Sequence, residues 1–214
     1  HSKRPGRMSS EKLYISYNNV HKLCQQAAVD LKKDGRNVDL IIAIGGGGFI
    51  PARILRSFIR EEGKKNIPIQ AIGLSLYEQL TDTVVESIGK EVIRTQWIDF
   101  GNLGTHIDSL IGKKIVIVDE VDDTRTTLHY ALTELKKDVA KLQKELGRED
   151  EKTEFFIFVL HNKEKPKRAE LPEELMKLGR YIAGKNVPDQ WIAYPWEAID
   201  IDTHTEHAAA QGNI

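Results

Sequence analysis

The stretch that decides the fold is Ile115-Val116-Ile117-Val118-Asp119-Glu120-Val121-Asp122-Asp123-Thr124-Arg125-Thr126-Thr127. Its first four residues are apolar and β-branched, which predicts a buried strand. Carboxylates and threonines follow at once, before a helical pattern that begins near Leu128. The carboxyl ends of strands are where open α/β sheets bind ligands, and a turn that opens a helix can hold a phosphate with its N–H groups. The stretch therefore predicts a strand, a ligand site and a helix in succession.

Helix capping explains only part of this stretch. Asp and Thr favour N-cap positions, and acids suit the first turn of a helix. Such a cap uses one carboxylate and one threonine, whereas Asp119, Glu120, Asp122 and Asp123 fall within five positions. Their mutual repulsion needs hydroxyl donors, a cation or solvent to relieve it. A ligand that brings hydroxyls, phosphate and Mg²⁺ would satisfy the whole set.

Composition and size limit the classes of protein to consider. The 214 residues fit one main core with a small appendage. The formal net charge of −1 gives no general affinity for nucleic acid, and no apolar run approaches the length of a membrane span. Cys24 is the sole cysteine, which favours a reducing compartment, and it lies on an apolar helical stripe where we expect burial. We expect a soluble cytoplasmic protein without nucleic-acid or membrane partners.

Strands alternate with helices along the chain. Residues 1–7, which precede Met8, are interpreted as an expression remnant, and 8–214 as a single domain. Alternation of this kind predicts a mainly parallel sheet with right-handed crossovers. The expected elements are a helix capped by Asn18 or Asn19 that ends before Gly35, strands at 39–44, 68–75, 92–100, 115–118 and 155–160, helices at 49–62 and 128–146, and loops at 77–91 and 162–171.

Four consecutive glycines, Gly45-Gly46-Gly47-Gly48, follow the strand at 39–44. A flexible linker is one interpretation. A linker seldom separates a buried strand from an amphipathic helix, however, and residues without Cβ allow the backbone to approach a ligand closely. We expect Pro51 in the first turn of the helix that follows, where a missing N–H costs little.

The stretch 115–127 resembles the phosphoribosyl pyrophosphate signature of type I phosphoribosyltransferases. In that family an apolar strand leads to paired acids and then to an Asp-Thr phosphate loop. The resemblance assigns Asp119 and Glu120 to the ribose hydroxyls and Mg²⁺. It assigns Asp123 to the 5′-phosphate loop and also to catalysis near purine N7, as in the 6-oxopurine branch. The remaining phosphate-loop residues are Thr124, Arg125, Thr126 and Thr127.

Two positions depart from the family pattern. Arg125 stands where the family usually has glycine, and Asp122 where it usually has an apolar residue. If the turn needs a positive φ, Arg125 is strained and the loop geometry differs. The glycine run resembles the pyrophosphate loop, in which a Lys-Gly or Arg-Gly pair is common. Here the pair is Gly46-Gly47, so Gly45 to Gly48 must hold pyrophosphate through backbone N–H groups.

Two further segments extend the resemblance. Leu74 to Glu78 sits where the family has a Ser-Tyr pair that opens a mobile catalytic loop, which points to Ser75 and Tyr77, with Leu76 in the place of the serine. A closed loop would exclude water from the activated sugar. The aromatics near the carboxyl end resemble the purine-binding hood, where Trp191 stacks on the base, Ile192 offers main-chain groups and Glu197 helps to hold Mg²⁺.

The cation that selects a 6-oxopurine is left open by the sequence. The family places a lysine at the end of the hood strand, where it donates to purine O6. Here His161 occupies the strand end and Lys163 follows, with Lys165 a third candidate. Lys163 is preferred, because a permanent cation favours an oxo acceptor over an amino donor.

The resemblance implies an α/β protein with the type I phosphoribosyltransferase fold. A mainly parallel twisted sheet would be flanked by helices, with a small hood built mainly from about 161–214 plus N-terminal residues. The chain looks closest to the fungal xanthine and hypoxanthine-guanine enzymes, which transfer phosphoribose from phosphoribosyl pyrophosphate to N9 of a 6-oxopurine. Xanthine is favoured, Mg²⁺ is the implied cofactor and a homodimer the implied assembly. The alternatives are a non-catalytic regulator that senses phosphoribosyl pyrophosphate and a transferase for adenine or a pyrimidine.

Overall fold

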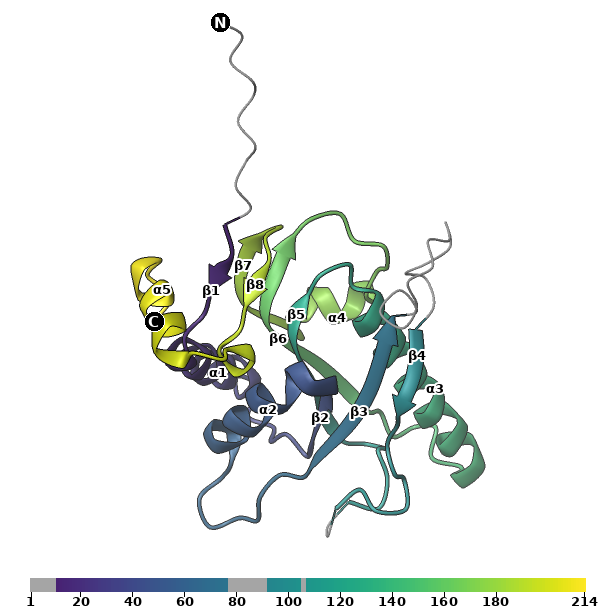
Figure 1. The fold of residues 1–214 in the computed structure, drawn as a ribbon. Coiled ribbons are helices and arrows are strands. Elements are labelled where there is room, and N and C mark those ends of the chain that lie inside the picture. Colours follow the sequence, from purple (N-terminus) through teal and green to yellow (C-terminus); the bar gives the residue numbers. More distant parts are fainter. Residues whose placement is uncertain (1–10, 77–91, 105–106) are drawn as a thin grey trace, which may run out of the picture.

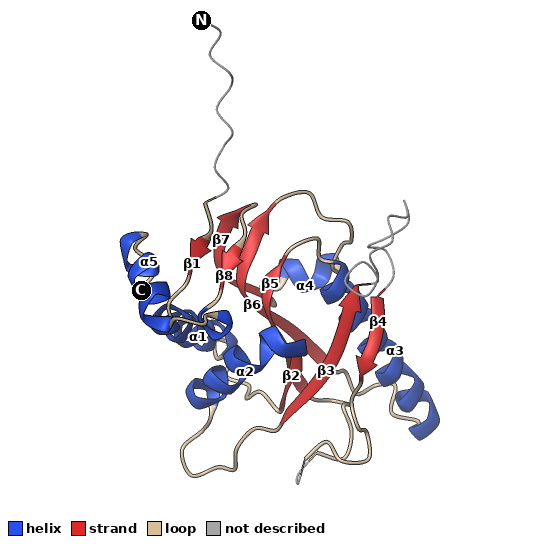
Figure 2. Ribbon diagram, viewed as in Figure 1, coloured by secondary structure: helices blue, strands red, loops and turns tan. Residues whose placement is uncertain are grey.

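The computed structural model describes residues 11–76, 92–104 and 107–214. A six-stranded sheet forms the centre of the molecule, with helices on both sides (Figures 1 and 2). None of the helices in these residues is both long and apolar enough to cross a membrane. The elements are β1 (Leu13–Tyr14), α1 (Tyr17–Leu31), β2 (Leu40–Ile44), α2 (Gly45–Ile59), β3 (Ile69–Leu76), β4 (Val92–Gln96), β5 (Lys114–Asp122), α3 (Thr126–Leu146), β6 (Glu154–Glu164), α4 (Glu173–Lys177), β7 (Tyr181–Pro188), β8 (Ile192–Ala193), a 3₁₀ turn (Pro195–Glu197) and α5 (Ile201–Ala210).

The strand order of the main sheet is β4-β3-β2-β5-β6-β7. All neighbouring pairs run parallel except β3 and β4, which are antiparallel. The mainly parallel α/β sheet that the alternating pattern predicts is therefore confirmed. Because β2 and β5 lie side by side in the middle, their carboxyl ends meet at the position where ligands bind in open sheets.

The two faces of the sheet carry separate apolar layers. Val116 and Val118 of β5 pack into one core cluster with α1 and α2. Ile115 and Ile117 face the opposite side, where they pack with α3 and α4. This alternation explains why the strand is a continuous apolar run, since both of its faces are buried.

A second sheet contains only β1 and β8, which pair in parallel between Leu13 and Ile192. It lies beside β7 (Figure 1). Residues near the carboxyl terminus form hydrogen bonds with β1. Gln211 Oε1 accepts from Tyr14 N at 2.7 Å, and Asn213 Nδ2 donates to Tyr14 O at 3.0 Å. This small unit joins the two ends of the described chain.

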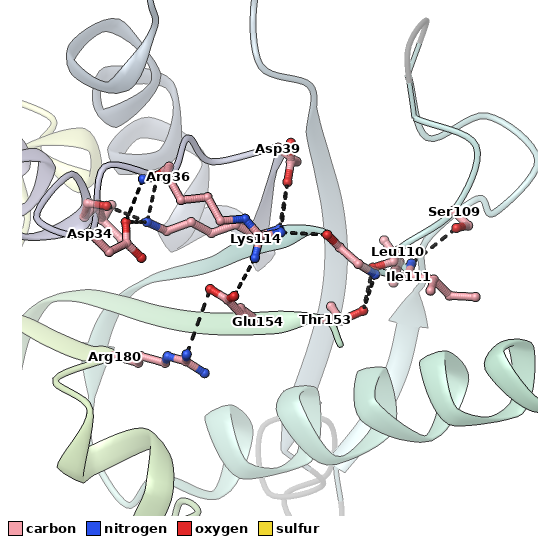
Figure 3. A network of polar contacts seen from close by, with 12 residues as sticks. Asp34, Arg36, Asp39, Ser109, Leu110, Ile111, Lys114, Thr153, Glu154 and Arg180 are labelled. Carbon is pink, nitrogen blue, oxygen red and sulfur yellow. Dashed lines mark hydrogen bonds and ion pairs between the residues drawn. The ribbon is translucent and has the colours of Figure 1, made fainter. Parts of the chain in front are cut away.

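A polar network closes the other end of the sheet, at the start of β5 (Figure 3). The Lys114 side chain is fully buried, and its Nζ donates to Leu31 O at 2.7 Å, Asp34 Oδ1 at 2.7 Å and Arg36 O at 2.9 Å. All three ammonium protons thus have acceptors, which is the condition under which a buried lysine is tolerated. The network lies about 25 Å along β5 from Asp122, given the rise of a strand, and we interpret it as structural.

Several predicted boundaries were wrong. Ser16, and not Asn18 or Asn19, caps α1 through a bond from Asn19 N. The helix after β2 begins at Gly45, so Pro51 lies inside it and not in its first turn. Two strands also differ in length, because β4 ends at Gln96 while β6 continues to Glu164, into residues expected to form a loop.

Candidate functional site

A hollow of about 540 Å³ opens at the carboxyl ends of β2, β3 and β5. Its volume falls within the usual range for small-molecule sites. Carboxylates, glycines, threonines and cationic side chains share it, although they come from separate elements. Its walls are Ile44, Gly45, Gly46, Gly47, Leu74, Leu76, Asp119, Glu120, Val121, Asp122, Asp123, Thr124, Arg125, Thr126, Thr127, Leu128, Lys165 and Arg168.

Asp119 and Glu120 are adjacent carboxylates in the last part of β5. Asp119 is buried, and its Oδ1 accepts from Glu120 N at 2.8 Å. Burial, together with the negative charge of Glu120, raises the pKa of Asp119 well above its usual value. A bound cation or hydroxyl donors would relieve this repulsion.

The glycine run forms the first turn of α2 instead of a free loop. A Cβ on Gly48 would collide with the backbone carbonyl of Val118, so α2 can approach β5 closely only with glycine at this position. A Cβ on Gly47 would meet the Glu120 carboxylate, which lies directly over it. The run therefore brings a helix N-terminus against the acidic strand end.

The two helices that begin at this hollow lack side-chain caps. Ile44 precedes α2 and Arg125 precedes α3, and neither makes a capping hydrogen bond. By contrast, Ser16 caps α1 and Asp200 caps α5. The first N–H groups of α2 and α3 are therefore left for other partners, and such N-termini suit phosphate groups.

Arg125 adopts φ 71° and ψ 0°, the left-handed conformation. Among the residues that the structure describes, it is the one non-glycine residue with a positive φ. The backbone strain that is expected at Arg125 if this turn needs a positive φ is therefore present. The Arg125 guanidinium points toward Asp122, with Nε 2.9 Å from Oδ2. The sequence predicts that Arg125 binds the 5′-phosphate, but in the structure its positive charge is paired with a carboxylate of the protein.

Asp123 faces Lys165, whose Nζ lies 2.8 Å from Asp123 Oδ1. Burial raises the pKa of the Asp123 carboxyl, but the hydrogen bond from Lys165 and the charges of Lys163, Lys165 and Lys167 outweigh this, so the pKa lies below its usual value. The Lys165 ammonium also reaches Asp189 Oδ1 at 3.3 Å. Asp123 is therefore ionised and accessible at the edge of the hollow.

The structure distinguishes the three candidates for the cation that donates to purine O6. His161 is fully buried, and burial together with the charge of Lys185 lowers its pKa to about 4. Tyr194 Oη donates to Glu120 O at 3.0 Å and lies 2.9 Å from His161 Nδ1, so Nδ1 carries the imidazole proton and Nε2 is an acceptor. A neutral His161 of this tautomer has no proton to offer O6 through Nε2.

The two lysines differ in position. Lys165 lines the hollow beside Asp123, whereas the preferred Lys163 is not part of its wall. Lys163 lies in β6, paired in register with Val187, and its charge still acts on Asp123. The structure therefore brings Lys165 directly to the predicted catalytic carboxylate, and Lys163 only to its neighbourhood.

The predicted hood residues Trp191, Ile192 and Glu197 are not part of the wall of the hollow. Trp191 is 66% exposed, which leaves its ring free to stack on a ligand. Ile192 is buried in β8, so only its main chain can serve a base. Glu197 lies in the 3₁₀ turn and, with Asp119 and Glu120, contributes to the raised pKa of Tyr194, of which burial is the main cause.

Two other predictions concern the mobile loop and the metal. Ser75 lies in β3 but not in the wall of the hollow, and Tyr77 falls outside the described residues. Within residues 11–76, 92–104 and 107–214, no group of three or more His, Cys, Asp or Glu side chains converges as a metal site. Two adjacent carboxylates still suit Mg²⁺, which usually takes few protein ligands and completes its shell with water and substrate phosphates.

Sequence reasoning missed several residues that the fold brings here. Lys167 Nζ donates to Asp122 O, Asp123 O and Lys163 O at 3.1, 2.8 and 2.8 Å. Arg168 lines the hollow, and its backbone N–H donates to Thr124 O at 2.9 Å. Their signal was the run of cationic residues just beyond β6, the strand next to β5.

These features describe an α/β protein with a polar hollow at the carboxyl edge of a mainly parallel sheet, between two helices that lack side-chain caps. Comparison with protein families gives a match over residues 15–177 to the phosphoribosyl transferase domain. The chain belongs to the phosphoribosyltransferase family, whose members are pentosyl-transferring enzymes. The resemblance inferred from the segment at 115–127 is thereby confirmed.

Individual relatives are similar over nearly their whole lengths. Xanthine phosphoribosyltransferase 1 of Saccharomyces cerevisiae is 64% identical over 95% of this chain and 98% of its own. Hypoxanthine-guanine phosphoribosyltransferase of Schizosaccharomyces pombe is 59% identical over 97% and 99%. A crystal structure of a hypothetical protein from Neisseria gonorrhoeae with bound ppGpp is 34% identical, with a TM-score of 0.71 over 96% and 99% of the two chains.

Proposed function

We propose that the protein transfers the 5-phosphoribosyl group from phosphoribosyl pyrophosphate to N9 of a 6-oxopurine, giving the nucleoside 5′-monophosphate and pyrophosphate. One observation carries this proposal: a single hollow gathers the acidic end of β5, the uncapped starts of α2 and α3, and the Asp123–Lys165 pair. The substrates named for the two fungal relatives are xanthine and hypoxanthine with guanine. Such a transferase would serve purine salvage.

The sugar and its phosphates would occupy the hollow. Asp119 and Glu120 would accept hydrogen bonds from the ribose hydroxyls, and residues 123–127 would bind the 5′-phosphate through the free N–H groups at the start of α3. Gly45 to Gly48 would hold the pyrophosphate in the same way at the start of α2. The ppGpp bound by the Neisseria protein contains a guanine, a ribose and two diphosphate groups, so it shares the chemical parts of these ligands.

Asp119 and Glu120 also form the proposed Mg²⁺ site. Glu197, the third carboxylate that the resemblance assigns to Mg²⁺, does not converge with them and is left out of it. The raised pKa of Asp119, due to burial and the adjacent Glu120 charge, supports a need for positive charge there. Mg²⁺ bound with the substrate would neutralise the departing pyrophosphate. The protein's own contribution is to orient the sugar by its hydroxyls and to hold the two phosphate ends apart at two helix N-termini.

At the base, the chain's residues would position the purine and accept a proton. Trp191 would stack on the ring, and the main chain of Ile192 would meet its 2-position edge. Asp123 would accept or stabilise the N7 proton while N9 attacks C1 of the sugar after the C1–O bond breaks. Lys163 or Lys165 would donate to O6, and Lys165 is favoured by its place in the hollow beside Asp123.

The test of this function is a base panel. Purified protein with Mg²⁺ and phosphoribosyl pyrophosphate is offered xanthine, guanine, hypoxanthine and adenine separately, and pyrophosphate release is measured. We expect release with the three 6-oxopurines, fastest with xanthine. Release with adenine alone would overturn the substrate class. No release with any base would favour a regulator that senses phosphoribosyl pyrophosphate.

We further propose that the protein acts as a homodimer in the cytoplasm, without nucleic-acid or membrane partners. The homodimer is proposed from the resemblance to the phosphoribosyltransferase family. The reduced, buried Cys24 is compatible with a reducing compartment. Light scattering after size-exclusion chromatography should give twice the mass of one chain, whereas the mass of one chain would contradict the dimer.

A further inference from the structure

The two positions that depart from the family pattern are bonded to each other. Asp122 ends β5 with a fully buried side chain, and Arg125 follows three residues later with 14% of its side chain exposed. Arg125 Nε and Nη2 both lie 2.9 Å from Asp122 Oδ2. Each residue therefore supplies the partner that the other requires, since a buried charge without one is unfavourable.

A tyrosine from β7 completes this pairing. Tyr181 Oη donates to the same Asp122 Oδ2 at 2.6 Å, and the Arg125 guanidinium lies over the Tyr181 ring at 5.0 Å from its centroid. Oδ2 thus accepts two hydrogen bonds, from Arg125 Nε and Tyr181 Oη, and also lies close to Arg125 Nη2. The other oxygen, Oδ1, has no hydrogen bond and lies 3.8 Å from Lys167 Nζ. Without Arg125, most of the compensation for this buried carboxylate is lost.

The pair also holds an unfavourable backbone conformation at the start of α3. Arg125 has φ 71°, a conformation that glycine adopts freely and that a side chain with a Cβ resists. Its carbonyl accepts the helical bond from His129 N at 3.0 Å, so this turn sets where α3 begins. In place of a glycine, the chain uses a charge-assisted contact to a buried strand residue to keep the turn in place.

We propose that Asp122 and Arg125 are a mutually dependent pair of positioning residues, with Tyr181 as their support, that fixes the loop at 123–127 for its phosphate ligand. This inference rests on the proposed function, because it takes that loop as the 5′-phosphate site. Neither side chain touches the reacting atoms. It follows that a protein with only one of the two residues binds the phosphate ligand more weakly than a protein with neither. Asp122→Val with Arg125→Gly should therefore form a compatible alternative pair.

The experiment is a double-mutant cycle on Asp122→Val, Arg125→Gly and the combination of both. Each single change should raise KM for phosphoribosyl pyrophosphate and the Kd of GMP about tenfold, within the range of couplings between contacting residues. The double variant should return to within about threefold of the parent, because it has neither the buried charge nor the strained residue. Turnover should change less than KM, since phosphate binding is shared by ground and transition states.

Two further variants make the test specific. Tyr181→Phe should weaken GMP binding less than Arg125→Gly does, because the ion pair survives. Arg148→Ala removes an exposed arginine that contacts Glu151, also three residues away, and should leave both constants unchanged. Additive losses in the double variant, or an Arg125→Gly protein with parental affinities, would overturn the proposal.

Calorimetric binding of GMP separates this inference from the proposed function. If the parent protein transfers to no base, the transferase proposal fails, but the GMP cycle still reports whether the two residues are coupled at a phosphate site. If the parent is active and the cycle is additive, only the positioning pair fails. Coupling in melting temperature alone, with GMP affinity unmoved, would reduce the pair to a structural contact and also overturn the proposal.

Discussion

At the scale of single residues, the contact between Asp123 and Lys165 decides the state of the proposed base. The carboxylate is kept ionised by cationic neighbours, chief among them Lys165 at 2.8 Å. An ionised group at the edge of the hollow is prepared to accept a proton from a base bound there.

Asp123→Asn should lower kcat by about a hundredfold, in the range typical of lost general acid–base catalysis. GMP affinity should change by less than about threefold, because the lost interaction belongs to the transition state. Steady-state kinetics and calorimetry measure the two effects. Asp189→Asn is the matched control, since it also removes a carboxylate from Lys165 but lies outside the wall of the hollow. Unchanged turnover in Asp123→Asn would remove this residue from the mechanism.

Lys165→Met should shift the acidic limb of the kcat/KM profile to higher pH. In the parent, Lys165 lowers the pKa of Asp123, so the base stays ionised as the pH falls. Without Lys165, the burial that raises this pKa is opposed less, and Asp123 is protonated at a higher pH. Lys177→Met, at an exposed lysine that contacts Glu173, is the control. An acidic limb that does not move would show that another group limits the rate in acid.

At the scale of elements, Gly48 and Gly46 have different roles in the glycine run. Gly48 permits α2 to pack on β5, because a Cβ there would enter the Val118 carbonyl. Gly46 has open space around its α-carbon, with nothing within 4 Å of an added Cβ. One glycine is needed for packing, and the other is available to a ligand.

Gly48→Ala should therefore destabilise the protein by about 1–3 kcal/mol, the usual range for overpacking. Gly46→Ala, its neighbour in the same turn, should be neutral or stabilising by up to about 1 kcal/mol, because alanine favours helices. Urea denaturation of both variants measures the difference. Equal stabilities would mean that α2 does not depend on this close approach.

At the scale of the whole molecule, His161 joins β6 to the segment that follows β8. Its imidazole lies against Tyr194, which stacks on Trp196 with ring centroids 4.7 Å apart and donates to Glu120 O. The buried ring is held neutral by burial and by Lys185. Because the folded protein holds the His161 imidazole neutral, the stability of the fold depends on pH.

The folded-state pKa of His161 is about 4, whereas an unfolded histidine titrates near 6.5. Between these values the unfolded chain binds more protons, so stability rises with pH through this window and is lost as pH falls. The full effect is about 3 kcal/mol. His161→Gln should flatten that part of the curve of melting temperature against pH, while His21→Gln, at an exposed position, should keep the parental slope. A parental slope in His161→Gln would assign the effect to other groups.

Local pattern was sufficient for much of the fold. The apolar run at 115–118 predicted a strand buried on both faces, and the alternation of strands and helices predicted the parallel sheet; both are confirmed. Pattern failed at boundaries. The helical pattern at 49–62 predicts a helix that begins after the glycines, yet the glycines form the first turn of α2, packed against β5.

The sequence by itself determined the order of the elements, the phosphoribosyltransferase family and the acidic, glycine-rich and threonine-rich segments that meet in one hollow. Those properties follow from residue type and spacing along one strand or helix. Only the tertiary structure decided that Arg125 turns to Asp122 and that Lys165 reaches Asp123 while His161 is buried. These choices depend on β6 lying beside β5 and on β7 lying beside β6. Contacts between strands distant in the chain are set by packing and burial rather than by local pattern.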